Sequence, residues 1–493
     1  MTENVHDKGL ARDAIGLVSS VAVGVASVTP VTGVALLFGL MIVSLGVHLP
    51  GFVLLGFLPI LLIASAIKAL NRAEPDCGYS FAWVTRAFGP SAGWMIGFLV
   101  VASLAVVMTN YAQLLGAYTF SLIGADGAAA STRDVTVLGV AWLLLVTFLG
   151  YRGLRLAARV QFPLFVIELV VLVAFGAIAL VRGIAESPSG SRAVSFDWFL
   201  PTGVGSGGLA TGFATAVLLY WGWEGTVALS EETEDSERIP GIAAVASTVI
   251  LVILYLVCAV GVLAFAGPEA IARSPDDVLS LIGSQVLGST LDRVLVFTVV
   301  TASFAGAIFL PVTAARVLLS MADHGAVPAW LGAVHPRYRT PGNATIAVAV
   351  AGLAYYVVLT VVSESVLIDS LTALGLIVAV IYAATGVACA AYFRRVARGP
   401  RAVLSLIVGP LVGALALVLV LIKSAIDLAD PVNSVSGQAW LGLGAPLMLA
   451  AIIVVVGIVL LLVSRVVHPA FFERRPEAAS TLGPSDAAVE TGA

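Results

Sequence analysis

Charge is scarce in this chain of 493 residues: Asp, Glu, Lys and Arg together make up 11% of it, and histidine occurs only five times. The three cysteines are scattered without paired spacing, which argues against a disulfide framework or a cysteine-rich metal site. A soluble protein of this length would need a far more charged surface. We therefore exclude a soluble multidomain protein and expect no metal, no cofactor and no nucleic-acid partner.

Apolar residues fill the composition instead, at 60% of the chain with a mean hydropathy of +1.06. Windows of about 20 apolar residues are the signature of helices that cross a bilayer. They predict an all-α polytopic membrane protein with twelve transmembrane helices, at about residues 14–40, 44–69, 91–122, 135–150, 160–182, 205–230, 241–266, 291–322, 343–363, 367–393, 402–424 and 441–464.

The basic residues are distributed unevenly between the two sides of this predicted topology. Of the 25 basic residues, 19 fall on the side of the N-terminus and 6 on the other. Cytoplasmic loops carry an excess of Lys and Arg, so we expect a multi-pass protein of the cytoplasmic membrane with both termini inside. Residues 1–13 form an N-terminal tail, and residues 465–493, polar and rich in Pro, Ala, Glu and Ser, are expected to be disordered.

The apolar segment 205–230 contains a polar and glycine-bearing interruption, Tyr220–Gly225, that includes Glu224. A carboxylate near mid-membrane costs about 2.5–3.5 kcal/mol or more, so it requires a specific role. Two glycines beside it favour an unwound helix that lines a cavity, which indicates transport. The backbone groups freed there are our candidate substrate contacts: Leu219, Tyr220, Trp221, Gly222 and Trp223.

The first predicted helix has an irregularity of its own, Gly24–Pro30. A simple proline kink would explain it when taken alone. However, the first and sixth helices begin two sets of five, and interrupted helices at matching positions indicate a secondary transporter's binding site. Opposed helix ends offer amides to a carboxylate and carbonyls to an ammonium group, which suits a zwitterion. The corresponding contacts are Val25, Ala26, Ser27, Val28 and Thr29.

Several side chains near these interruptions have two interpretations. Glu224 is predicted to gate or couple transport, or else it only caps the freed amides. Trp221 and Tyr220 either close over the substrate or pack as ordinary aromatics. Asn110 on the third helix either lines the cavity or joins helices by a hydrogen bond. The acidic run 231–237 is expected to be a solvated loop that pairs with arginines.

Glu168 lies in the fifth apolar segment without a basic residue nearby in sequence. Burial penalises its charged form, so the group is suited to carrying a proton, or to holding a cation if hydroxyls and carbonyls join it. A hydrogen-bonded structural carboxylate is the alternative. We favour a coupling role for Glu168, with protons ahead of sodium.

Three stretches of the chain carry distinctive motifs. The first is residues 216–224 with Glu231-Glu232 and Ile239-Pro240, the second is the eighth helix and its loop, residues 315–341, and the third is residues 77–90. Together they resemble the amino acid–polyamine–organocation (APC) superfamily of amino acid permeases, and the first stretch is similar to the sixth helix and following loop of those permeases. The first helix departs from the family's glycine-serine-glycine pattern, since Val25–Val28 stands in its place.

The resemblance implies a fold with a 5+5 inverted repeat and interrupted helices 1 and 6. The repeats would be residues 14–182 and 205–393, followed by helices 11 and 12 at 402–464. It also implies that Glu168 lies near helices 1 and 8, where Thr301 and Ser303 are neighbours for a coupling ion.

The expected function is import of an amino acid by alternating access, as a proton symporter and not an enzyme. An amino acid/amine exchanger or a polyamine importer of the same fold is the alternative. An integral-membrane enzyme would need a polar cluster at the membrane surface, which the sequence does not offer, and a channel would leave the matched interruptions without a purpose. The substrate's identity and the oligomeric state are open.

Overall fold

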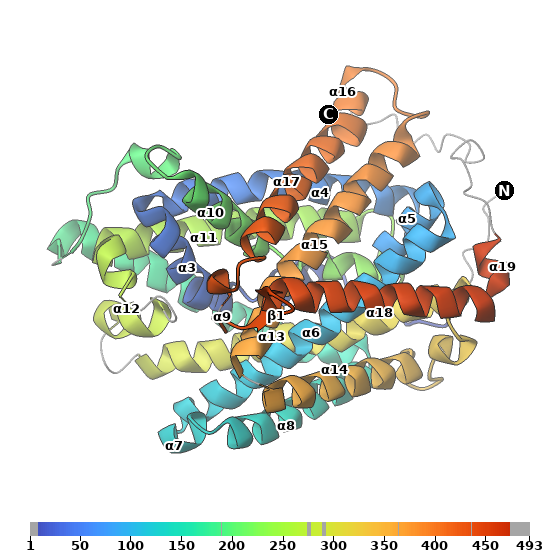
Figure 1. Ribbon diagram of the computed structural model, residues 1–493, viewed down its shortest axis with the longest axis horizontal. Coiled ribbons are helices and arrows are strands. Elements are labelled where there is room, and N and C mark those ends of the chain that lie inside the picture. The colour runs from blue at the N-terminus through green and yellow to red at the C-terminus, as the bar shows by residue number, and fades with distance from the viewer. Residues whose placement is uncertain are drawn as a thin grey trace.

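A computed structural model describes residues 8–188, 190–273, 278–287, 292–362, 364–434 and 436–473 of the chain. The described part is almost entirely helical (Figure 1). Within these described ranges, ten segments are long and apolar enough to cross a membrane. This confirms an all-α polytopic membrane protein, whereas the count of twelve helices and the inverted repeat stay predictions.

The first of these ten segments, Leu17–Ala73, is 57 residues long, more than twice what one crossing needs. It covers the first two expected helices. The structure interrupts the first of them at Thr29, a residue in the left-handed conformation, and the second begins near Gly46, which has a positive φ. Its elements are α1 (Leu17–Val28), α2 (Pro30–Thr32), the π-helical turn η1 (Gly33–Leu37), α3 (Phe38–Leu45), the 3₁₀ turn η2 (Gly46–His48) and α4 (Leu49–Ala73).

The middle of the chain continues as helices with short connections. They are α5 (Ser80–Phe88), α6 (Pro90–Leu122), α7 (Asp126–Ala129), α8 (Thr132–Tyr151), α9 (Leu154–Glu186), η3 (Phe196–Phe199), α10 (Ser206–Leu218), η4 (Trp223–Glu232), α11 (Ile239–Ile271), α12 (Val278–Leu287) and α13 (Asp292–Asp323). The expected helix at 205–230 is absent from the ten segments because α10 has 13 residues and η4, a 3₁₀ helix, has 10.

The remaining elements are η5 (Ala329–Gly332), α14 (Gly342–Val362), α15 (Glu364–Phe393), α16 (Pro400–Val403), η6 (Leu404–Val408), α17 (Gly409–Asp427), η7 (Pro431–Asn433), the short antiparallel strands β1 (Ala439–Trp440) and β2 (Leu443–Gly444), α18 (Ala445–Val467) and α19 (Pro469–Phe472). Helix α18 and α19 extend into the expected C-terminal tail. Residues 474–493 of that tail and residues 1–7 lie outside the described part.

The core is built where long apolar helices pack along one another. Helix α13 packs on α6, and α11 packs on both α4 and α9. Helices α8 and α14 lie side by side at the lower edge of Figure 1, and both contact α6. These contacts place α1 and η4 against α11 and α13, so the two interrupted segments meet the same central helices.

The outer helices expose apolar faces. On α18, Val455, Val459 and Val463 are spaced four residues apart on one helical face, and each is more than half exposed. A continuous apolar face of this kind is stable against lipid and not against water. It supports the assignment of the protein as embedded in a membrane.

Candidate functional site

The first interruption is a break in the helix at Thr29. Thr29 adopts a left-handed conformation (φ 50°, ψ 67°), and its N–H bonds back to the carbonyl of Ala26. The next residue, Pro30, has no N–H to continue the ladder and starts α2. Small or β-branched residues surround the break, and Val25, Ala26 and Val28 are buried. The helix is therefore broken at the position that Pro30 predicts.

Glu168 of α9 caps this break. Because Pro30 lacks an amide hydrogen, Val31 has the first free N–H of the new helix, and it donates to Glu168 Oε1 at 3.0 Å. Glu168 is fully buried, and its second oxygen, Oε2, has no hydrogen-bond partner among the described residues. The hydroxyl oxygens of Thr32 and Ser303 lie 3.5 Å apart on the same side of the break. The structure thus joins Glu168 and Ser303 to the first interruption.

The second interruption follows α10. Gly222 has φ 119°, a conformation that favours glycine, and η4 starts at the next residue. A Cβ atom at Gly222 would stand 2.8 Å from the carbonyl oxygen of Ser27, so the two interruptions touch backbone to backbone. Gly225 faces Ser27 and Thr313 at ordinary contact distance. Only glycine permits the approach at Gly222.

Glu224 caps the second interruption in the way that Glu168 caps the first. Its Oε2 accepts the N–H of Gly222 at 3.2 Å and the hydroxyl of Tyr382 on α15 at 2.5 Å. The Glu224 side chain is 7% exposed. Glu224 therefore does act as a cap, and it also ties η4 to α15. Sequence reasoning missed Tyr382 because it lies within an uninterrupted apolar run.

The aromatic residues of the second interruption separate into packed and half-buried side chains. Tyr220 is fully buried and donates to the carbonyl of Val53 on α4 at 2.9 Å. Tyr255 donates to the carbonyl of Leu219 at 3.0 Å. Trp223 is fully buried beside Tyr382, with ring centroids 5.7 Å apart. Trp221 is only half-buried, and its side chain hydrogen-bonds the Glu224 carboxylate.

Two further candidates make their hydrogen bonds away from the interruptions. The amide of Asn110 donates to Ser370 Oγ on α15 at 2.9 Å and to the carbonyl of Val106, which is the helix-joining arrangement. The hydroxyl of Thr301 bonds carbonyls of its own helix. The neighbour of Asn110, Tyr111, is the residue that reaches the site: its hydroxyl lies 2.5 Å from Thr29 Oγ1. The position of Tyr111 directly after the polar Asn110 on the third predicted helix was the available signal.

The hydrogen bond between Tyr382 and Glu224 gives a first prediction. Tyr382→Phe is expected to lower substrate uptake by about tenfold, because a hydrogen bond to a charged group contributes about 1.5–3 kcal/mol. Glu224→Gln should lower it similarly, and the double variant should be no worse than either single one. Uptake into proteoliposomes, normalised to folded protein, measures all three.

A matched control is Tyr392→Phe on the same helix, because the Tyr392 hydroxyl is buried without a partner. It should transport like the wild type. If the losses of uptake from Tyr382→Phe and Glu224→Gln are additive in the double variant, the two side chains act independently, and transport does not depend on the hydrogen bond between them.

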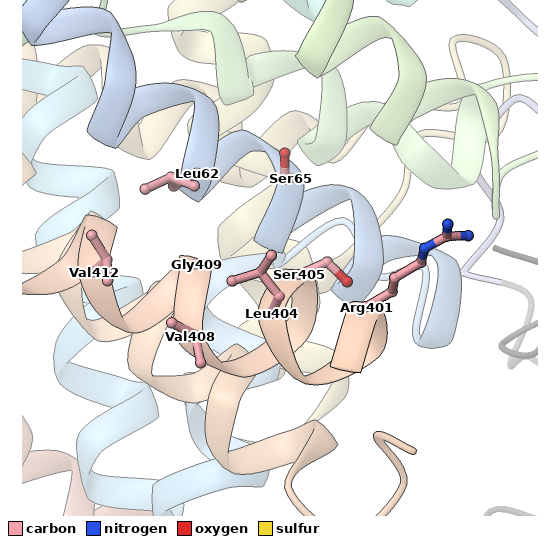
Figure 2. A pocket seen from close by; sticks show the side chains of 8 residues that line it. All are labelled: Leu62, Ser65, Arg401, Leu404, Ser405, Val408, Gly409 and Val412. Atoms are coloured by element: carbon pink, nitrogen blue, oxygen red, sulfur yellow. The ribbon is translucent and has the colours of Figure 1, made fainter. Parts of the chain in front are cut away.

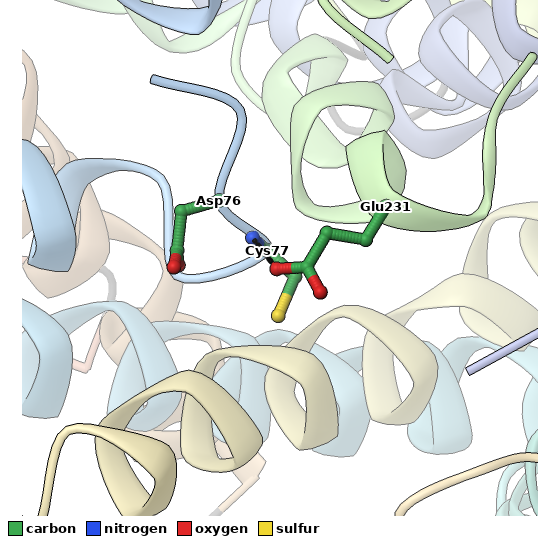
Figure 3. Close-up of side chains that lie close together, drawn as sticks. All are labelled: Asp76, Cys77 and Glu231. Atoms are coloured by element: carbon green, nitrogen blue, oxygen red, sulfur yellow. Dashed lines mark hydrogen bonds between the residues drawn. The ribbon is translucent and has the colours of Figure 1, made fainter. Parts of the chain in front are cut away.

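A polar cluster ties the N-terminal segment to two connecting loops at one end of the helices. Lys8 Nζ lies 2.9 Å from Asp76 Oδ2 and 2.7 Å from Glu231 Oε1. Glu231 also accepts the N–H of Cys77 at 3.0 Å (Figure 3). The side-chain ligand atoms of Asp76, Cys77 and Glu231 lie within 4.8 Å of one another, close enough for a metal ion. However, the Lys8 ammonium already pairs with both carboxylates and occupies the space between them, so we assign no metal there.

The expectation of a solvated acidic loop at 231–237 is wrong for Glu232. That side chain is 1% exposed and forms a two-pronged salt bridge with the fully buried Arg316 of α13, at 2.7 Å and 3.2 Å. The predicted pairing with an arginine is confirmed. The N–H groups of Ala14 and Ile15 donate to the carbonyl of Glu232 and cover this end of η4, whereas Glu234, Asp235 and Glu237 are exposed as expected.

The charges around Asp76 predict a pH dependence of stability. Burial opposes ionisation of Asp76, but Lys8 and His324 outweigh it and hold the pKa of Asp76 at about 2, below the ordinary 3.8. A lowered carboxyl pKa contributes stability above the unfolded value that is lost as the pH falls toward the folded one. The thermal midpoint of wild type minus that of Asp76→Asn in detergent should therefore be constant from pH 7 to 5 and shrink between pH 4 and 2.

Glu473→Gln is a suitable control, since this carboxylate is exposed and lies outside the cluster. It should leave the midpoint unchanged at every pH. A difference between wild type and Asp76→Asn that does not depend on pH would contradict the charge assignment.

Two cavities lie apart from the interruptions. One, of about 480 Å³, is a groove between α4 and the helical stretch α16–α17 (Figure 2). It is lined mainly by apolar side chains such as Leu62, Leu404 and Val412, which suits a lipid-facing surface. The other, of about 470 Å³, is rich in arginine.

Ten apolar spans and two touching helix breaks, each capped by a buried carboxylate, define a polytopic membrane protein of the transporter class. The chain belongs to the amino acid permease family, whose model matches residues 13–459. The family and its relatives are transporters and not enzymes.

Curated relatives agree with the family. The chain is 25% identical to human Asc-type amino acid transporter 1 over 55% of this chain and 51% of that protein. It is 22% identical to a branched-chain amino acid permease of Lactococcus lactis, over 59% of this chain and 64% of that one. It is 25% identical to a low-affinity putrescine importer of Escherichia coli, over 70% and 74%. The matched region thus covers about half of the human transporter and a little under two thirds of the Lactococcus lactis permease.

Proposed function

We propose that this protein imports an amino acid across the cytoplasmic membrane by alternating access, driven by protons. We propose further that it has twelve transmembrane helices in a 5+5 inverted repeat plus two, with both termini in the cytoplasm. The observation that carries it is the contact of Gly222 with the Ser27 carbonyl, which brings two helix breaks together. Such paired breaks are where secondary transporters bind substrate.

Glu168 is the group that we propose carries the proton. Its Oε2 is buried without a partner, and a bare carboxylate there is unfavourable in low dielectric. Binding a proton removes the charge while leaving Oε1 free to hold the Val31 amide. Sodium would need further oxygen ligands beside Glu168, and of the two predicted neighbours Ser303 lies 3.5 Å from Thr32 at the break, whereas the printed bonds of Thr301 are within its own helix.

A polyamine importer or amino acid/amine exchanger is the second candidate, and a specific observation favours it. Both new helix starts are already occupied by carboxylates, at Val31 by Glu168 and at Gly222 by Glu224. A substrate carboxylate would compete with them, whereas an amine would be attracted. The putrescine importer among the relatives points the same way.

Binding and uptake measurements separate the two candidates. Purified protein is heated with each amino acid and with putrescine at pH 5.5 and 7.5, and the ligands that stabilise it are tested for uptake into empty proteoliposomes. An amino acid importer accumulates an amino acid when the outside is acidified. Uptake of diamines alone would favour the second candidate, and uptake only into vesicles preloaded with substrate would identify an exchanger.

A further inference from the structure

A basic pocket lies at the connection between α8 and α9, away from the two helix breaks. Its volume is about 470 Å³. Three segments meet there: the N-terminal segment, the α8–α9 connection and the loop before α14. The residues that line it are Ala11, Arg12, Arg152, Gly153, Leu154, Arg155, Arg337, Tyr338 and Arg339.

Positive charge accumulates in this pocket. Within the described ranges, Arg152, Arg155, Arg337 and Arg339 form no salt bridge with a carboxylate, and none of the described lining residues is acidic. Tyr338 organises two of them, with the Arg152 and Arg337 guanidinium carbons 5.1 Å and 5.7 Å from its ring centroid. Like charges held this close repel one another, so a bound anion would stabilise the arrangement.

The start of α9 adds to the positive potential. Gly153 (φ 108°) precedes the helix, and the position of its missing Cβ lies 2.9 Å from the carbonyl oxygen of Tyr338. Glycine therefore lets the loop before α14 approach the first turn of a helix of 33 residues. The free amides and the dipole of a helix start favour an anion.

We propose that this pocket binds a phosphate group, carried by an anionic lipid headgroup or by free phosphate. Planar guanidinium groups match phosphate oxygens two at a time, and five arginines line this pocket. The pocket lies where the candidate spans Thr132–Tyr151 and Leu154–Glu186 end and begin, so it stands at the membrane surface. Basic pockets at such a depth recognise lipid headgroups.

The test uses the full-length protein in detergent. Its thermal midpoint is measured while phosphatidylglycerol, phosphatidylcholine or inorganic phosphate is added at constant ionic strength. The variant is Arg155→Gln with Arg339→Gln. Arg152 and Arg337, which stack on the Tyr338 ring, are kept, so the packing around that ring is unchanged. The matched control is Arg394→Gln with Arg395→Gln, which removes the same charge from two exposed arginines outside the pocket.

Saturable stabilisation by phosphatidylglycerol and not by phosphatidylcholine is expected in the wild type and in the control. The pocket variant should need on the order of tenfold more lipid for half the effect. If inorganic phosphate stabilises equally well, free phosphate is the source. An equal loss in both variants, or no stabilisation by either phosphate compound, would overturn the proposal.

Discussion

Glu168→Gln is expected to abolish accumulation of substrate against its gradient while the protein still exchanges substrate across the membrane. Glutamine keeps a carbonyl oxygen for the Val31 amide, so the capped break is retained, but it cannot release or take up a proton. A proton moved inward gains about 2.3 kcal/mol per 100 mV, which supports a concentration ratio of roughly fiftyfold. In the variant this ratio should fall to about one.

Two measurements on proteoliposomes establish this result. Uptake driven by an inward proton gradient gives the concentration ratio, and counterflow of labelled substrate at equal pH on both sides gives the exchange rate. Glu168→Ala is the informative companion, since it also removes the acceptor of the Val31 amide and should lower thermal stability as well as accumulation. If Glu168→Gln accumulates substrate with the wild-type pH dependence, the proton is carried elsewhere.

The helix breaks themselves were predictable from local sequence. Pro30 removes a donor, and Gly222 permits a conformation that other residues resist, so both positions follow from covalent chemistry. The rarity of a carboxylate in an apolar run likewise identified Glu168 and Glu224. These signals depend on one residue and its sequence neighbours, so they can be recognised without a structure.

The partners of those carboxylates were not predictable. The Val31 amide that Glu168 binds is 137 residues away in the sequence, and the Tyr382 hydroxyl that binds Glu224 is 158 residues away. Nothing in an apolar run marks Tyr382 as different from any packed tyrosine. Asn110 had two interpretations in the sequence, and only the structure shows that its amide joins α6 to α15. Helix packing decides these contacts.

Glu232→Gln is expected to be the most destabilising of the single substitutions considered, by about 3–5 kcal/mol. The reason is that it leaves the fully buried Arg316 guanidinium without a counterion, and removing one partner of a buried pair has that cost. Because this salt bridge joins the end of η4 to α13, its loss should also release the second interruption from the helix behind it. Thermal unfolding in detergent measures the stability, and protease accessibility of the 231–237 loop measures the release.

The double variant Arg316→Met with Glu232→Met distinguishes a missing charge partner from damaged packing. Replacing a buried pair by apolar residues of similar volume is often neutral, so the double variant should be more stable than Glu232→Gln. Glu269→Gln, which breaks an exposed pair with Arg192, should change nothing measurable. If the double variant retains its fold but transports poorly, the salt bridge serves the conformational cycle and not the stability of the resting state. If it is as unstable as the single variant, the shape of the Arg316 side chain matters more than its charge.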